Sequence, residues 1–243
     1  MFRLISRPAL ELSRVSVQSL ALATTQVRHL ARLPDDPTIT DAITHDHREL
    51  QDYYGRLMAL DENDYDNKSR WQNQLTWELA RHAVGEEIVL YPAYEKYLGA
   101  EGKKAADKDR NSHQKTKELL EYFQRLYPQS KEFKPSLVEL MEELEKHMRS
   151  EEKDELPMLE EALAKTKPES GIGGKSRSQE LALSFSRTKM FVPTRGHPWM
   201  PNKPPYETVL GLLAMPVDVL ADMFRKFPKE KQRTTESLSG GLK

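Results

Sequence analysis

The chain has 243 residues, of which 37% are hydrophobic and 31% are charged, and its formal net charge is −1. Because basic residues are not in excess, nucleic acid is not an expected partner. The chain contains no run of about eighteen apolar residues, which is the length that would indicate a transmembrane helix. Cysteine is absent, which excludes disulfides, thiolate metal sites and iron–sulfur clusters. Any bound metal must therefore be held by nitrogen and oxygen.

The first 33 residues have the composition of a mitochondrial transit peptide. They contain five arginines, no lysine and one acid, Glu11, among scattered serines and small apolar residues. Transit peptides form basic amphipathic helices, whereas a secretory signal needs an unbroken apolar run. We therefore expect residues 1–33 to be a transit peptide and the protein to be mitochondrial. The alternative is a disordered basic tail on a cytoplasmic protein.

Between residues 38 and 165, helix-forming residues dominate and apolar residues recur at helical spacing. The helices are expected at about residues 38–60, 67–98, 103–127 and 135–165. Gly99 and Gly102 end the second, Pro128 stops the third, and the apolar face of the fourth is expected to continue to Met158 and Ala162. Amphipathic helices joined by short connections predict an all-α, antiparallel up-down four-helix bundle.

After the bundle, the composition changes. Residues 166–205 are rich in glycine, serine, proline and basic residues, which bury too little apolar surface to order themselves, so a disordered linker is expected. Residues 206–227 form an apolar element interrupted by Pro216, for which we expect a short helix. This helix would dock on its own domain, on a partner or on a membrane surface. Residues 228–243 are expected to be a disordered tail.

A fourteen-residue pattern, H-x-x-x-E-E-x-x-x-x-P-x-x-E, occurs twice, beginning at His82 and at His147. Another lone histidine precedes each copy at nearly the same distance, His47 by 35 residues and His113 by 34. Residues four apart lie on the same side of a helix, so each motif histidine projects with the glutamate that follows it. In both helices that side is the apolar one.

Four histidines and two glutamates are therefore expected to point into the bundle core. Burying the two carboxylates without partners would be costly, and a pair of cations would compensate them. Imidazole and carboxylate ligands favour two iron ions, with manganese or zinc as alternatives, and the glutamates are able to bridge the ions. The predicted metal ligands are His47, His82, Glu86, His113, His147 and Glu151.

The neighbours of these residues have less specific roles. Glu87 and Glu152 lie about 100° from the ligand direction, so they are expected to be solvated or to orient a histidine. Pro92 and Pro157 are expected to kink or loosen their helices, or to end them. Tyrosines near the ligands would line the site or serve only in packing, and these are Tyr54, Tyr91 and Tyr94.

These motifs resemble the hemerythrin-like, or HHE cation-binding, domain over about residues 38–165. The residues that carry the resemblance are Asp46-His47, His82-x-x-x-Glu86, His113 and His147-x-x-x-Glu151. It implies a non-heme di-iron centre inside an up-down-up-down bundle, with Glu86 and Glu151 as bridging ligands and the histidines as terminal ligands. Oxygen carriers of the family have a further histidine where this chain has Lys117, so the resemblance does not imply reversible oxygen carriage.

The leading hypothesis is a non-heme di-iron binding protein that acts as a sensor, buffer or protective sink, with dioxygen or nitric oxide as candidate ligands. Such a protein is not an enzyme. The first alternative is a di-iron redox enzyme of oxidase or peroxidase type, which requires a substrate channel and a proton donor. The second is a metal-free structural bundle, in which the inward polar groups hydrogen-bond to one another and to buried water.

Overall fold

The computed structural model describes residues 33–169, 174–203, 216–218 and 220–229. Nearly all of the expected transit peptide lies outside these ranges, as does most of the expected C-terminal tail. The same is true of the first part of the apolar element expected at residues 206–227.

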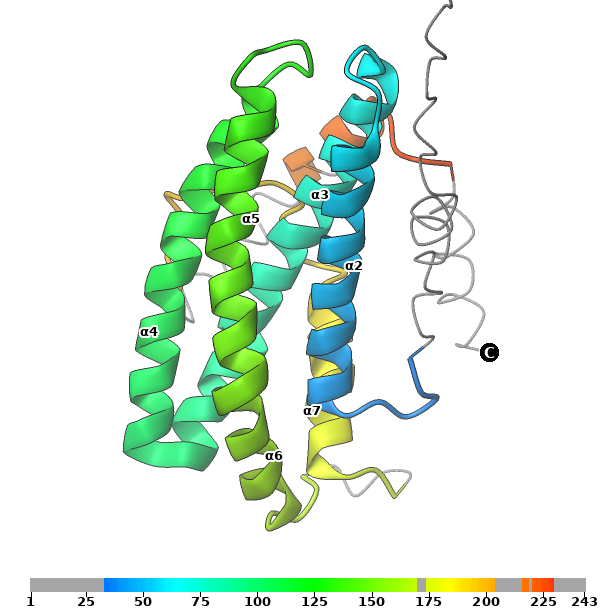
Figure 1. Ribbon diagram of the computed structural model, residues 1–243. Coiled ribbons are helices and arrows are strands. Elements are labelled where there is room, and N and C mark those ends of the chain that lie inside the picture. Colours follow the sequence, from blue (N-terminus) through cyan, green and yellow to red (C-terminus); the bar gives the residue numbers. More distant parts are fainter. Residues whose placement is uncertain (1–32, 170–173, 204–215, 219, 230–243) are drawn as a thin grey trace, which may run out of the picture. The chain divides into compact units, whose positions relative to one another are not determined.

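The described part of the chain is helical and contains no strand. Its helices are α2 (Ile39–Ala59), α3 (Tyr65–Gly85), the π-helical turn η1 (Glu86–Leu90), α4 (Tyr91–Arg125), α5 (Phe133–Ser150), the π-helical turn η2 (Glu151–Glu155), α6 (Leu156–Ala164) and α7 (Arg177–Thr188). Within residues 33–243, the long helices α2, α3, α4 and α5 pack in a closed ring, each antiparallel to the next in the chain (Figure 1). The predicted all-α helical bundle is confirmed.

The first bundle helix begins where the sequence predicts. The side chain of Thr38 accepts a hydrogen bond from the Asp41 amide at 3.1 Å, and Asp41 accepts one from the Thr38 amide at 2.9 Å. This reciprocal capping box satisfies two amides that the helix leaves free, and it fixes the start of α2. The helix then ends before Leu60.

Gly99 makes the reversal between the second and third bundle helices. Its φ of 62° and ψ of −127° lie outside the helical region, and α4 changes direction there. Gly102 is needed for a different reason, because a Cβ atom at this position would lie 1.9 Å from the Tyr94 carbonyl oxygen. The two glycines therefore place the bundle corner where the sequence predicts it, although the backbone remains helical on both sides.

The two repeated motifs both pass through a π-helical turn. Pro92 and Pro157 lack an N–H group, so the regular ladder of hydrogen bonds cannot continue through them. In η1 the Tyr91 amide bonds to the Glu86 carbonyl, and in η2 the Leu156 amide bonds to the Glu151 carbonyl. The helices are therefore loosened near the prolines and do not end there.

The wide turn η2 shifts the apolar face of the helix that follows it. The sequence expectation that Met158 lies on this face is wrong, because Met158 is 43% exposed. Leu159 and Leu163 are buried instead, each one position later than the residue expected there. A π-helical turn holds one residue more than an α-helical turn, so every later side chain is displaced by one position.

The expectation of a disordered linker over residues 166–205 is also wrong, because α7 lies within it. Ser176 and Gln179 form a capping box at the start of this helix. Leu181, Ala182 and Phe185 form a buried apolar face, and α7 packs against α2, η1 and α6. The polar composition of the surrounding segment concealed this short apolar face.

The described residues of the 206–227 element contact their own chain. Residues 216–218 and 220–222 are helical. The Asp218 carboxylate accepts a hydrogen bond from the Thr194 amide at 3.0 Å, and the Thr194 hydroxyl donates to Asp222 at 2.7 Å. No helix in the described ranges is long and apolar enough to cross a membrane.

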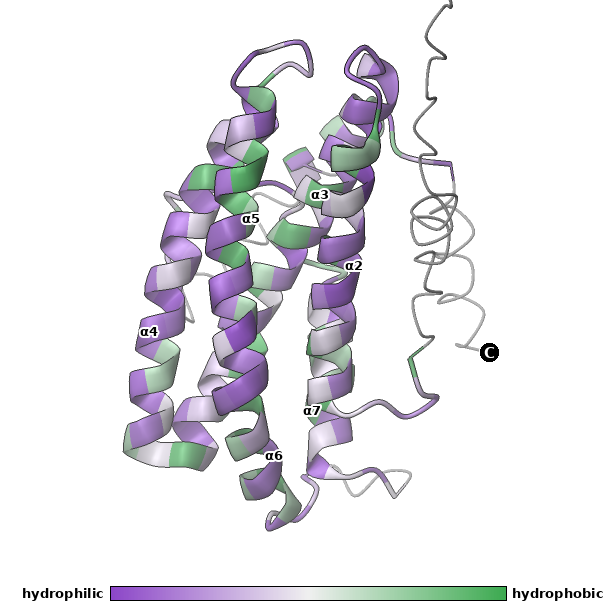
Figure 2. Ribbon diagram, viewed as in Figure 1, coloured by the Kyte–Doolittle hydropathy of each residue, from purple (hydrophilic) through white to green (hydrophobic). Residues whose placement is uncertain are grey.

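The bundle core consists of two apolar clusters. One contains Ile39, Ala42, Ile43, Val89, Leu90, Tyr91, Ala93, Tyr94, Ala106, Leu156, Leu159, Leu163, Leu181, Ala182 and Phe185. The other contains Leu50, Tyr53, Leu57, Leu75, Leu79, Ala80, Leu120, Phe123, Phe133, Leu137, Leu140, Met141, Leu144 and Met148. Hydrophobic and hydrophilic residues are interspersed along each long helix (Figure 2). Along the chain, the predicted ligands fall near the change from one cluster to the other, although Met148 of the second cluster follows His147.

Candidate metal centre

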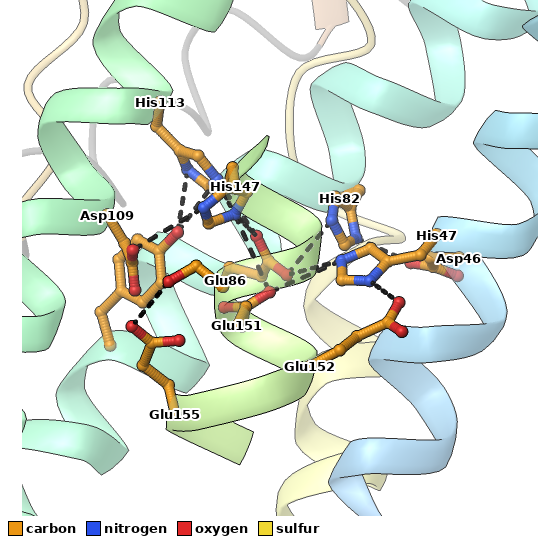
Figure 3. Close-up of polar contacts among 12 residues, drawn as sticks. Asp46, His47, His82, Glu86, Asp109, His113, His147, Glu151, Glu152 and Glu155 are labelled. Carbon is orange, nitrogen blue, oxygen red and sulfur yellow. Dashed lines mark hydrogen bonds and ion pairs between the residues drawn. The ribbon is translucent and has the colours of Figure 1, made fainter. Parts of the chain in front are cut away.

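All six predicted ligands are buried in one place inside the bundle. Four helical segments supply the histidines, and the two π-helical turns supply the glutamates (Figure 3). The exposed fraction of these residues is at most 4%. They are His47 from α2, His82 from α3, Glu86 from η1, His113 from α4, His147 from α5 and Glu151 from η2.

The carboxylate of Glu86 lies between two pairs of histidines. Its Oε1 atom is 3.1 Å from His82 Nε2 and 3.9 Å from His47 Nε2. Its Oε2 atom is 3.2 Å from His113 Nε2 and 3.8 Å from His147 Nε2. Glu86 therefore completes two groups of two histidines and one carboxylate, each compact enough to hold a metal ion.

Glu151 lies between the same two groups. Its Oε2 atom is 3.5 Å from His47 Nε2 and 3.8 Å from His147 Nε2. Two carboxylates that each face histidines from both groups are the arrangement that a bridged pair of metal ions needs.

Each of the four histidines has a further carboxylate close to Nδ1, the ring nitrogen that faces away from the centre. Glu152 lies 2.8 Å from Nδ1 of His47, and Asp46 lies 3.3 Å from Nδ1 of His82. On the other side, Glu87 lies 3.3 Å from Nδ1 of His113 and Asp109 lies 3.7 Å from Nδ1 of His147. Outer carboxylates that hydrogen-bond in this way, as Glu152, Asp46 and Glu87 do, fix the orientation of a metal-binding imidazole and keep its Nε2 atom available. The contact between Asp109 and His147 is too long for a hydrogen bond.

Of the two roles considered for Glu87 and Glu152, orienting a histidine is the one that the contacts support. Each outer carboxylate also has a basic partner. Arg48 donates to Glu152 at 2.9 and 2.7 Å, Lys117 pairs with Glu87, Lys189 pairs with Asp46, and the Lys108 ammonium lies 3.5 Å from Asp109. The pattern of imidazole, carboxylate and cation thus occurs four times.

Two tyrosine hydroxyls reach the centre. The Tyr91 hydroxyl lies 2.9 Å from His113 Nε2, and the Tyr94 hydroxyl donates to Glu151 Oε1 at 3.2 Å. Tyr54, which was expected near the ligands, is partly buried against the second apolar cluster instead. Tyr91 and Tyr94 therefore line the site, and Tyr54 serves in packing.

Several buried atoms that face the centre have no hydrogen-bond partner among the described residues. These atoms are Nε2 of His47 and His82, both carboxylate oxygens of Glu86, and Oε2 of Glu151. The Nε2 atoms of His113 and His147 also face each other at 3.1 Å. Leaving buried polar atoms unsatisfied is costly, and metal cations would satisfy all of these nitrogen and oxygen donors together. The residues present therefore fit the cations that their chemistry implies.

The protonation of the site depends on these contacts. Burial disfavours a charge on His47, but the adjacent carboxylates of Glu151 and Glu152 outweigh this effect and raise the pKa of His47 to about 9. Burial also disfavours the charged form of Glu152, but hydrogen bonds with His47 and Arg48 outweigh this effect and lower the pKa of Glu152 to about 2. The neighbouring carboxylates raise the pKa of His113 and His147 as well, so without a cation these three histidines tend to carry protons. A metal must displace these protons, so its binding releases them.

Some residues of the site escaped the sequence analysis. Asp109 lies one helical turn before His113, a spacing that could have identified it. No local signal marks Lys189 or Glu78, because their proximity to Asp46 depends on how distant helices pack. Asp46, Glu49 and Glu78 form a further group of buried carboxylates. The Lys189 ammonium donates hydrogen bonds to Asp46 and, at 2.6 Å, to Glu78.

Comparison with known proteins gives the family. The family model described as the hemerythrin HHE cation binding domain matches residues 38–159. The chain is also 52% identical over 190 residues to a protein of Schizosaccharomyces pombe described as an uncharacterized hemerythrin-like protein. The aligned region covers 78% of this chain and 88% of the relative. No solved structure matches significantly. Together with the buried histidine and carboxylate centre, these matches show that the chain belongs to the hemerythrin family of HHE cation-binding domains.

Proposed function

We propose that this chain is a non-heme di-iron protein that binds dioxygen or nitric oxide and acts as a sensor, buffer or protective sink. One observation carries the proposal: two groups of two histidines and one carboxylate share Glu86 inside the bundle. A set of imidazole and carboxylate ligands suits iron, with manganese or zinc as the alternatives. Because both groups of histidines share one carboxylate, the site suits two ions held side by side.

The ligand residues would hold the ions, and their surroundings would control access. Iron in such a set supplies a site that exchanges a small ligand and changes oxidation state. The ligand residues are at most 4% exposed, so bulk water is excluded from them. The outer carboxylates hold the imidazoles in one orientation, and the apolar clusters on either side keep the surroundings of low polarity. These features favour a diatomic ligand over an organic substrate.

A di-iron redox enzyme is the second candidate, and the tyrosine hydroxyls are the observation in its favour. The Tyr94 hydroxyl donates to Glu151, and the Tyr91 hydroxyl contacts His113. Burial and the neighbouring carboxylates raise the pKa of both tyrosines well above the ordinary value, so both hydroxyls keep their protons. A reaction that consumes protons at the centre could draw on these groups.

Anaerobic reconstitution with ferrous iron tests the proposal. Nitric oxide and then dioxygen are added to separate samples while the visible spectrum is followed, with metal-free protein as the control. Spectral changes that saturate at a fixed ratio of gas to protein, with negligible peroxide turnover, support ligand binding as the function. Sustained turnover of peroxide with a reducing co-substrate would favour the enzyme, and absence of any spectral response would contradict both.

We also propose that the protein is mitochondrial, on the basis of the arginine-rich composition of residues 1–33. A fusion of this segment to a fluorescent protein is expected to enter mitochondria, whereas a matched fusion with the five arginines replaced by glutamine is not. Diffuse cytosolic fluorescence of the unaltered fusion, with an intact N-terminus on the native protein, would contradict the assignment.

A further inference from the structure

Helix α7 lies outside the family domain but contacts the metal centre. The family match ends at residue 159, and α7 begins at Arg177. The similarity to the fission yeast protein extends further, because a match that spans 190 residues of this chain must run to about residue 190 or beyond. A related protein therefore shares similarity that includes α7.

Side-chain hydrogen bonds attach both ends of α7 to the bundle. At its start, the Ser178 hydroxyl accepts from the Ile39 amide and donates to Glu160, both at 2.8 Å. Just past its end, the Arg81 guanidinium donates to the Lys189 carbonyl at 2.7 Å. A cation at this end of a helix is favourable, because the last carbonyls carry partial negative charge. The position of α7 on the bundle is thus set at two separated points.

Phe185 in the middle of α7 covers His82. Its ring centroid is 6.2 Å from that of the imidazole, and the two rings are perpendicular, at 89°. The ring lies directly over Gly85, where an added Cβ atom would come within 2.8 Å of Phe185 Cε2. The absence of a side chain at Gly85 is therefore what allows the aromatic ring to approach the ligand helix so closely.

Lys189, the residue after α7, contacts the carboxylate that stands behind His82. Its ammonium bonds to Oδ2 of Asp46, the same oxygen that lies 3.3 Å from His82 Nδ1, and to Glu78 at 2.6 Å. Lys189 is only 9% exposed. A buried ammonium between two buried carboxylates restricts where each carboxylate can point.

The origin of this lysine distinguishes it from the other three cations of the site. Arg48, Lys108 and Lys117 pair with the outer carboxylates behind His47, His147 and His113, and all three lie within the family domain. Among the described residues, the outer carboxylate behind His82 takes its cation from Lys189, beyond residue 159.

We propose that Lys189 is a positioning residue of the metal centre, and that α7 completes the half of the centre formed by His47, His82 and Glu86. This inference rests on the proposed function, because it treats the centre as a metal site. Without Lys189, Asp46 and Glu78 would face each other as buried carboxylates, and their repulsion would turn Asp46 away from His82. The half formed by His113, His147 and Glu86 would keep its outer groups.

Metal retention in full-length variants tests the inference. Lys189→Met removes the ammonium but keeps most of the length of the side chain, and Lys189→Arg restores a cation. Arg187→Met is the matched control, because it removes a positive charge from an exposed residue of the same helix. Each protein is loaded with ferrous iron without air, and the release of iron to a chelator is timed. We expect Lys189→Met to release one equivalent about ten to a hundred times faster than the second, while the arginine variant and the control release both slowly.

A second measurement separates positioning from a general effect on folding. Zinc-loaded protein with ¹⁵N-labelled histidine reports which ring nitrogen of each imidazole carries the proton. In the unmodified chain, His82 is expected to carry it on Nδ1, towards Asp46. Lys189→Met should alter the signals of His82 and leave those of His147 unchanged. A purely structural role would disturb both histidines together and release both ions equally fast, which would overturn the inference.

If Lys189→Met does not fold, Asp46→Asn takes its place, because it keeps Lys189 and the shape of the carboxylate but removes the charge between Lys189 and His82. Selective loss of one equivalent again supports the inference. Retention of both equivalents with unchanged release overturns it. Failure of the unmodified chain to bind any metal would instead contradict the proposed function, so the two failures are distinguishable.

Discussion

The imidazole of His47 and the carboxylate of Glu152 lie 2.8 Å apart, although 105 positions separate them in the sequence. Glu152 directly follows Glu151, whose Oε2 atom lies 3.5 Å from the other ring nitrogen of His47. Two successive residues of the turn η2 therefore contact opposite sides of one imidazole. This arrangement joins the first bundle helix to the last at the level of the centre.

Replacing Glu152 with glutamine should weaken metal binding by about tenfold, because a neutral amide supports the basicity of His47 less well than a carboxylate does. The change keeps the size of the side chain, so the fold should persist. Competition with a chelator of known affinity measures the effect. Glu161→Gln, at a surface glutamate paired with Lys165, is the control. Equal affinity in the two variants would show that Glu152 does not orient His47.

Gly85→Ala should destabilise the protein by about 1–3 kcal/mol, because the new methyl group would overlap the ring of Phe185. Gly55→Ala is the control. Gly55 lies inside α2 with no atom within 4 Å of an added Cβ, so alanine there should stabilise the helix by about 0.5–1 kcal/mol. Thermal or urea unfolding of both variants measures the difference. A stable Gly85→Ala protein would mean that α7 does not pack closely on α3.

Removing the metal should lower the melting temperature by about 10 °C or more, because ions bound only by the folded state stabilise it and the vacant ligands lose their partners. Melting curves before and after chelation, with metal loss verified, measure the change. An unchanged melting temperature at neutral pH would favour the metal-free structural bundle.

The effect of chelation should grow as the pH rises from about 6.5 to 9. In the metal-free chain, the raised pKa of His47 means that its ion pairs with Glu151 and Glu152 stabilise the fold fully below pH 6.5, and that this contribution is lost as the pH rises through about 9. Metal binding strengthens over the same range, because fewer protons compete for the ligands. Melting temperatures of loaded and metal-free protein across this range test the prediction. A difference that narrows with pH would contradict it.

Ferrous protein exposed to air should not recover its original visible spectrum under vacuum. Lys117 lies one helical turn after His113 and pairs with Glu87, so no imidazole is supplied at that position. Lys117→His should move the protein towards reversible behaviour, whereas Lys115→His, at an exposed lysine of the same helix, should not. Repeated recovery in the unmodified chain would show that the lysine does not prevent oxygen carriage.

The helical bundle and the convergence of the six residues could be predicted because both depend on local spacing. His82 with Glu86, and His147 with Glu151, each lie four residues apart on an apolar face, and such a face turns towards the core regardless of which helix it meets. The glycines at positions 99 and 102 marked the corner in the same local way.

The outer part of the site could not be predicted, because it depends on packing between distant segments. Lys189 is 143 positions from Asp46, and no periodic pattern joins them. The displacement of Met158 was hidden for another reason. Pro157 indicated a disturbance of the helix but not whether the chain would add a residue to the turn, and a single added residue decides which side chains are buried.

The number of metal ions per chain decides whether the two groups of histidines hold a pair of ions. Elemental analysis with an independent protein assay should give two equivalents of iron for the reconstituted chain. The surface variant Glu142→Gln should also hold two, and Glu86→Gln should hold far less, because both groups of histidines share this carboxylate. Retention of two equivalents by a Glu86→Gln, Glu151→Gln double variant would contradict the assignment of these carboxylates as metal ligands.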